Sequence, residues 1–131
     1  MSSRGGGPAL AGRRVLVVED EWLIAAEIGR ALEAAGAVVL GPALSVGEAL
    51  ALLRDGAPPP DAALLDVNLR GEPVTPVALA LAGRGVPFAL VTAFGAGDLG
   101  EPLLREAPRV GKPFAAAGLV RAVARLRPGA G

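Results

Sequence analysis

The sequence contains no histidine, no cysteine and no tyrosine, and the first two absences each remove a class of chemistry. Without histidine, the chain cannot form a Ser-His or Cys-His catalytic pair or a histidine-ligated metal site. Without cysteine, it has no disulfide framework, which is typical of proteins in a reducing compartment. We therefore expect a cytoplasmic protein that works without histidine or cysteine chemistry.

The sequence also has no excess of charge of either sign and no long apolar run. The formal net charge is zero, only 20% of residues are charged, and the sequence shows no run of Lys and Arg. Neither nucleic acid nor an anionic membrane is therefore an expected partner. No apolar stretch reaches the roughly 20 residues of a membrane helix, and the N-terminus does not resemble a signal peptide. The 131 residues suit one domain, and a hydrophobic share of 52% is enough for a core.

Lysine is nearly absent, and the exception is informative. The chain has twelve Arg but one Lys, Lys112, together with one Asn, Asn68, and two Thr, Thr75 and Thr92. Arg is broad and forked, whereas Lys is a compact point charge on a thin stem. A single Lys in an Arg-rich sequence therefore indicates a position that needs Lys, with chance survival as the alternative.

Apolar runs and helical patterns alternate five times between residues 13 and 127. We predict strands at 15–18, 38–40, 62–65, 88–91 and 109–110, and helices at about 22–35, 46–53, 76–83 and 114–126, with a brief one within 95–107. Ser45 and Glu48 form a capping box, and Thr75 before Pro76 suggests a second N-cap. Residues 1–12 and 128–131 are expected to be flexible tails. This alternation predicts a doubly wound α/β domain with a parallel sheet.

The scarce polar residues follow the predicted strands. Glu19 and Asp20 come after the first strand and Asp66 after the third, while Thr92 and Lys112 end the fourth and fifth. Because ligands of such sheets bind at the carboxyl ends of the strands, we expect these side chains to meet at one edge.

This set of residues has the parts that phosphoryl transfer requires. Three converging carboxylates would repel one another unless a hard cation such as Mg²⁺ joined them. The Asp66 carboxylate can attack phosphorus and form an acyl phosphate. Mg²⁺, the Lys112 ammonium and the Thr92 hydroxyl can then meet the three phosphoryl oxygens. The alternative is a set of solvent-facing polar residues in which Lys112 pairs with a carboxylate.

Four motifs carry these residues, in the order Val17-Val18-Glu19-Asp20-Glu21, Leu65-Asp66-Val67-Asn68, Val91-Thr92-Ala93 and Gly111-Lys112-Pro113-Phe114. Together they resemble the response-regulator receiver domain over about residues 13–127. The resemblance implies a flavodoxin-like (βα)5 fold with strand order 2-1-3-4-5.

The resemblance also implies a role for each site residue. Asp66 would be the phosphoacceptor, and Asp20 and Asp66 would bind Mg²⁺ directly. Glu19 would bind Mg²⁺ through a water molecule, and the backbone carbonyl of Asn68 would complete the set of protein ligands of the ion. Thr92 would be the switch hydroxyl. Lys112 would contact the phosphoryl group, with a cis peptide bond to Pro113.

The sequence departs from the usual receiver at the switch aromatic. Receivers usually carry Tyr or Phe three residues before the Lys, where this chain has Arg109. The run from Phe88 to Phe94 is instead similar to the "FAT GUY" receivers, with Ala93 for Gly and Phe94 for Tyr. Phe94 is therefore the candidate for the aromatic side chain that responds to phosphorylation. The alternative is that Phe94 is an ordinary core residue.

Trp22 begins the first helix beside the acidic pair. It either packs on the edge of the sheet or forms a contact surface for the phosphodonor. In receivers this helix docks on the helical bundle that presents the phosphohistidine, so the expected partners are a histidine kinase or a histidine phosphotransfer protein.

We therefore interpret the chain as a stand-alone response regulator of two-component signalling that catalyses only its own phosphorylation and dephosphorylation. A phosphate-sink or phosphorelay receiver without its own effector is the first alternative. A haloacid-dehalogenase-type phosphatase would place Asp-x-Asp after the first strand, whereas here the acceptor ends the third. A pseudo-receiver that only binds partners would not need the complete set of five residues.

Overall fold

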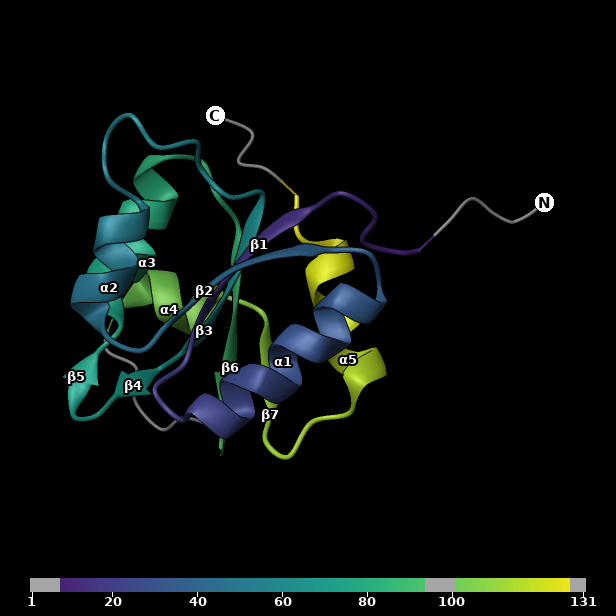
Figure 1. Ribbon diagram of the computed structural model, residues 1–131. Helices are drawn as coiled ribbons and strands as arrows, with labels where there is room; N and C mark the ends of the chain where they lie inside the picture. Colours follow the sequence, from purple (N-terminus) through teal and green to yellow (C-terminus); the bar gives the residue numbers. More distant parts are fainter. Residues whose placement is uncertain (1–7, 94–100, 128–131) are drawn as a thin grey trace.

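The computed structural model describes residues 8–93 and 101–127, which form one five-stranded parallel sheet covered by helices on both faces (Figure 1). Its strands are β1 (Arg14–Val18), β2 (Val38–Ala43), β3 (Ala62–Asp66), β6 (Phe88–Thr92) and β7 (Arg109–Gly111), in the order β2-β1-β3-β6-β7. Because β6 and β7 are the fourth and fifth strands of this sheet along the chain, the predicted order 2-1-3-4-5 is confirmed. The doubly wound α/β fold is confirmed with it.

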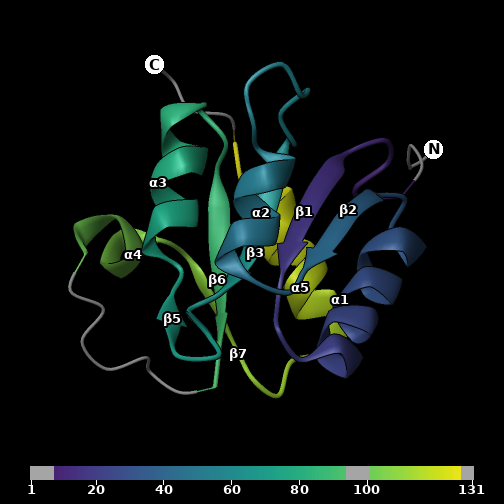
Figure 2. The same ribbon diagram turned by 60° about the vertical axis from the view of Figure 1, so that its left-hand side comes forward.

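Helices α1 (Trp22–Ala34) and α5 (Ala116–Arg125) pack side by side on one face of the sheet. Helices α2 (Val46–Leu52), α3 (Thr75–Gly83) and α4 (Pro102–Glu106) cover the other face (Figures 1 and 2). The brief helix expected within 95–107 is α4, which has five residues. None of the described helices is long and apolar enough to cross a membrane.

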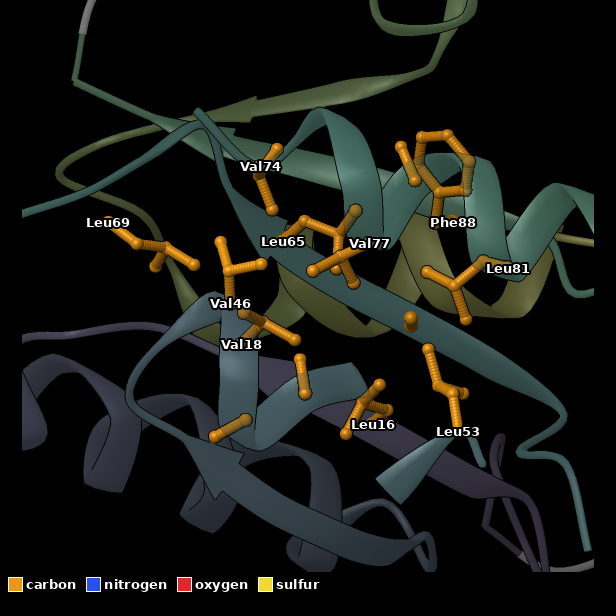
Figure 3. Close-up of a cluster of buried hydrophobic side chains, with 14 of the residues drawn as sticks. Leu16, Val18, Val46, Leu53, Leu65, Leu69, Val74, Val77, Leu81 and Phe88 are labelled. Atoms are coloured by element: carbon orange, nitrogen blue, oxygen red, sulfur yellow. The ribbon is translucent and has the colours of Figure 1, made fainter. Parts of the chain in front are cut away.

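Two hydrophobic cores form because each central strand is buried on both faces. Leu16 and Leu65 face the layer of α2, α3 and α4, as Figure 3 shows, whereas Val15, Val17 and Leu64 face α1 and α5. This double burial explains why the strands are continuous apolar runs in the sequence rather than alternating ones. The polar residues therefore begin where the apolar runs end.

The helix starts agree with the sequence in one case and correct it in another. The Ser45 hydroxyl accepts a hydrogen bond from the Glu48 amide at 3.1 Å, as the capping box predicts. Thr75, however, is the first residue of α3, and the N-cap position belongs to Val74. Val74 is fully buried, and its carbonyl accepts the first amide bonds of the helix, so core packing sets this start. Likewise, α5 begins at Ala116 rather than at 114.

The predicted N-terminal tail is too long. Leu10 is fully buried in the core beside α1, and its amide donates to the Ala35 carbonyl at 2.9 Å. A single Leu in a Gly- and Ala-rich stretch gives no periodic signal, although burying it removes a full apolar side chain from water. The ordered domain therefore begins before residue 13.

A small hairpin that the sequence did not indicate follows the third strand. Strands β4 (Asn68–Leu69) and β5 (Glu72–Pro73) pair antiparallel across a turn at Arg70 and Gly71. Both turn residues have positive φ, 54° and 88°, as a type I′ turn requires. Arg is an unusual residue in the left-handed region, so the turn could not be expected from its first position.

Candidate functional site

Three carboxylates meet at the carboxyl edge of the sheet, which is the lower edge in Figure 1. Glu19 and Asp20 follow β1, and Asp66 is the last residue of β3. One oxygen from each of them lies within 4.8 Å of the others. Because β1 and β3 are adjacent parallel strands, their ends bring these residues together as the sequence predicts.

Glu19 is the most deeply placed member of the cluster. Its side chain is completely buried, and Oε2 accepts a hydrogen bond from the Glu21 amide at 3.1 Å. Burial raises the pKa of Glu19 to about 7, and the nearby Asp66 charge acts in the same direction. Contacts with Lys112 and the Glu21 amide oppose this rise. Desolvation therefore dominates, and the carboxyl group is poised to gain or lose a proton near neutral pH.

Lys112 supplies the positive charge of the site. Its Nζ lies 2.9 Å from Glu19 Oε1 and 3.7 Å from Asp66 Oδ2, and its side chain is only 15% exposed. Burial alone would lower the pKa of Lys112, but Glu19 and Asp66 outweigh it, and the net shift is upward. The amine is therefore a stable cation held between two carboxylates.

Thr92 and Arg70 complete the surroundings of the cluster. Thr92 is the buried last residue of β6, and its carbonyl accepts the Lys112 amide at 2.7 Å, which ties the fourth and fifth strands together. Arg70, from the unexpected hairpin turn, places Nε 3.8 Å from Asp20 Oδ2. Since the Arg70 side chain is 73% exposed, this ion pair contributes little stability.

The cluster fits a hard divalent cation. Mg²⁺ is usually bound by one or two carboxylates and keeps several water molecules, which leaves the third carboxylate to bind through water. Glu19 Oε1 is buried and receives no hydrogen bond of good geometry from the described residues, so its contact with Lys112 is an ion pair alone. This buried carboxylate oxygen can therefore accept a hydrogen bond from a water molecule that is bound to a metal ion. Lys112 does pair with carboxylates, as the alternative interpretation expects, but that interpretation does not explain the third carboxylate.

The remaining predicted residues have different outcomes. Asn68 lies in β4, two residues after Asp66, and the use of its carbonyl as a ligand stays a prediction. Phe94 lies outside the described residues. Arg109 is exposed at the start of β7, and its Nη2 donates to the carbonyls of Leu104 and Arg105 at 3.4 and 3.1 Å. The position of the usual aromatic is thus occupied by a side chain that binds the end of α4.

Trp22 does not pack on the sheet. It is 67% exposed in the first turn of α1, and so is its neighbour Leu23. Beside this turn, a groove of about 460 Å³ runs between α1 and the loop after β7, lined by Ile24, Glu27, Ala93, Lys112, Pro113 and Phe114. Two large apolar side chains exposed next to the acidic cluster favour the contact-surface interpretation of Trp22. The Lys112–Pro113 peptide bond in this loop is cis, as expected, and Gly41–Pro42 is also cis.

Comparison with solved structures places this site in a family. SdrG from Sphingomonas melonis Fr1 is 44% identical, with a TM-score of 0.72, and the match covers 88% of this chain and 95% of that one. A second SdrG structure, of its BeF3-activated conformation, is 43% identical, with a TM-score of 0.70, and the match covers 87% of this chain and 95% of that one.

The response regulator PhyR from Brucella abortus is 29% identical, with a TM-score of 0.73 over 88% of this chain. The chain spans about half of PhyR, 47% of its length. No protein-family model and no curated protein sequence matches the chain. The identity with SdrG over nearly its whole length, the shared fold and the acidic cluster at the strand ends lead to one conclusion: this chain belongs to the response-regulator receiver domains.

Proposed function

We propose that this receiver is a phosphoacceptor switch in which Asp66 takes a phosphoryl group from a histidine kinase or a histidine phosphotransfer protein. The observation that carries the proposal is the position of the Lys112 ammonium, 3.7 Å from Asp66 Oδ2 in a cluster with two further carboxylates. A carboxylate nucleophile beside a fixed cation meets the main electrostatic demand of phosphoryl transfer.

Each side chain has a defined task in this proposal. An Asp66 oxygen attacks phosphorus, the bond from phosphorus to the histidine nitrogen breaks, and its electron pair stays on the imidazole. Glu19, Asp20, Asp66 and the Asn68 carbonyl would hold Mg²⁺, which when bound neutralises charge on the phosphoryl oxygens. Lys112 can leave Glu19 to meet one of these oxygens, and the Thr92 hydroxyl can donate to another. The chain would act on no substrate other than its own phosphoryl group.

The similarity to SdrG supports the proposed role of this chain as a phosphoacceptor. SdrG, which is 43% identical to this chain, has a structure in its BeF3-activated conformation. Beryllofluoride imitates a phosphoryl group, and we propose that this chain responds to it in the same way.

The acceptor is tested by incubating the protein with Mg²⁺ and acetyl phosphate and measuring its intact mass. We expect one phosphoryl adduct on the wild type and none on Asp66→Asn, because an amide is a poor nucleophile. Asp55→Asn, which alters an exposed aspartate away from the site, is the matched control and should label normally. Equal labelling of Asp66→Asn and the wild type would show that the acceptor lies elsewhere. The lifetime of the adduct, and its return to a kinase, would separate a switch from a phosphorelay receiver.

The phosphodonor would dock on the exposed first turn of α1. Trp22→Ala should slow phosphotransfer from an autophosphorylated histidine kinase by about tenfold, as expected for loss of an aromatic interface anchor, while labelling by acetyl phosphate stays normal. Leu79→Ala removes a similarly exposed side chain from α3, on the other face of the sheet, and should leave both rates unchanged. If both variants transfer at the wild-type rate, the donor does not use Trp22.

A further inference from the structure

The acidic cluster is contacted by two cations that come from different parts of the fold. The Lys112 ammonium lies 2.9 Å from Glu19 and 3.7 Å from Asp66, whereas the Arg70 guanidinium lies 3.8 Å from Asp20. Within the described part of the chain, Arg70 is the one residue that forms an ion pair with Asp20. The positive charge beside Asp20 therefore comes from the hairpin turn and not from Lys112.

These two cations differ in how far they are buried. The Lys112 side chain is 15% exposed and the Arg70 side chain is 73% exposed, while the Asp20 side chain that Arg70 approaches is 14% exposed. A guanidinium that already faces water can leave its partner at little cost, because most of its hydration is already in place. Lys112 is therefore the fixed cation of the cluster, and Arg70 is the exchangeable one.

The backbone that carries Arg70 is held in place, so that only the side chain has to move. Leu69, just before the turn, is fully buried in the core beside α2 and α3, and it pairs with Glu72 across the hairpin. The Val74 amide donates to the Val67 carbonyl at 3.0 Å and closes the base of the hairpin. The hairpin stands at the carboxyl edge of the sheet, at the lower left of Figure 1. It therefore presents Arg70 to the cluster from a fixed position.

The turn itself does not require an arginine. Arg70 has a φ of 54°, in the left-handed region that Asn, Asp and Gly occupy far more readily. Its pair with Asp20 is long and exposed, so the pair offsets little of this backbone strain. A strained residue beside a cluster of charged groups points to a role in that site rather than in the turn.

We infer that Arg70 competes with Mg²⁺ for Asp20 and so sets the Mg²⁺ concentration at which the cluster fills. This inference rests on the metal site of the proposed function. Direct binding of Asp20 to the ion requires the ion pair with Arg70 to break, and the guanidinium also repels a divalent ion nearby. Both effects act in the same direction, so the same carboxylates would bind Mg²⁺ more tightly without Arg70. Arg70 thus tunes the metal affinity and takes no part in the attack on phosphorus.

The test titrates Mg²⁺ into the whole chain at low ionic strength and follows the fluorescence of Trp22, the one tryptophan, which stands two residues after Asp20. We expect Arg70→Asn to lower the dissociation constant about fivefold, because the variant removes the charge while Asn suits a positive φ. Arg70→Lys keeps the charge and should stay within about twofold of the wild type. The shift in Tm with Mg²⁺ gives a second measure of the same affinities.

Two controls separate competition at Asp20 from a general effect of charge. Arg125→Asn removes the same charge from the end of α5, which lies near the amino end of β1, and it should bind Mg²⁺ like the wild type. At about 1 M NaCl the Debye length is only about 3 Å, so the difference between the wild type and Arg70→Asn should largely vanish.

Equal dissociation constants for the wild type and Arg70→Asn would overturn this inference and leave the metal site intact. Weaker binding by Arg70→Asn would also overturn it, because Arg70 would then support the site rather than compete with the ion. An equal gain in Arg125→Asn would attribute the effect to net charge alone. Absence of Mg²⁺ binding by both measures, in the wild type and in Arg70→Asn, would instead refute the metal site itself and the inference with it.

Discussion

Glu19 combines full burial with a charge partner, and the two effects oppose each other. Burial favours the neutral acid, while the ammonium of Lys112 at 2.9 Å favours the carboxylate. Burial is the larger effect, which leaves the pKa of Glu19 at about 7 against an ordinary value of 4.5. A carboxyl that titrates near neutral pH makes the whole cluster sensitive to pH.

This shift predicts how stability depends on pH in buffer free of divalent ions. Between about pH 4.5 and pH 7 the native state holds a proton on Glu19 that the unfolded chain has lost, so the free energy of unfolding should fall as pH rises through this range. The loss is on the order of 3 kcal/mol at most. Urea unfolding at several pH values measures it.

Glu19→Gln is the control for that measurement, because the amide keeps the shape of the neutral acid and cannot titrate. Its stability should fall less than that of the wild type over the same range. If the two proteins follow parallel curves, Glu19 titrates at the same pH in the native and unfolded states. Lys112 does not disturb this window, because its raised pKa lies above 10.5 and affects stability only at alkaline pH.

Among the helices, three are held at their C-terminal ends by arginines from other elements. Arg13 binds carbonyls at the end of α5, Arg84 binds Leu53 and Arg54 after α2, and Arg109 binds the last turn of α4. The last carbonyls of a helix lack partners within it and carry partial negative charge, so a guanidinium suits them well. Arg13, Arg84 and Arg109 therefore stabilise the C-terminal ends of helices.

Helix α4 should depend most on its arginine, because five residues cannot form a stable helix alone. Arg109→Ala removes hydrogen bonds worth about 1 kcal/mol, so the amides of Arg105 and Ala107 should exchange about fivefold faster with solvent. The central strands should be unaffected. Arg127→Ala, which removes an arginine that binds the Ala124 carbonyl of α5 rather than α4, is the control. Unchanged exchange in Arg109→Ala would show that packing of Leu104 alone holds α4.

The elements also show which features a sequence can reveal. The strands were predictable because a strand that is buried on both faces requires a continuous run of apolar residues. The site residues were predictable because they are the polar residues at which these runs end. The β4–β5 hairpin was not, since its turn begins with Arg70 rather than Asn, Asp or Gly. Neither was the burial of Leu10, nor the capping by Arg13 of a helix 110 residues away, because these contacts form only when distant segments meet.

At the scale of the whole molecule, binding of Mg²⁺ to the acidic cluster should be coupled to folding. The three carboxylates lie at the ends of two strands and meet only in the folded state. Mg²⁺ at tenfold excess over its dissociation constant should therefore stabilise the protein by about 1.4 kcal/mol, a rise of a few degrees in Tm. Asp20→Ala should remove most of this gain, and Asp55→Ala should keep it. A shift of the same size in all three proteins would contradict a metal site at Asp20.

The lone lysine has a practical consequence for anyone who handles this protein. Since the chain has one Lys and twelve Arg, every reagent that reacts with amines has two targets, the N-terminus and Lys112. Acylation of Lys112 would cancel the charge that lies between Glu19 and Asp66. Because Lys112 is only 15% exposed and its pKa is raised, dyes and cross-linkers aimed at amines should react first at the N-terminus. Forcing conditions that also reach Lys112 would modify the functional site itself.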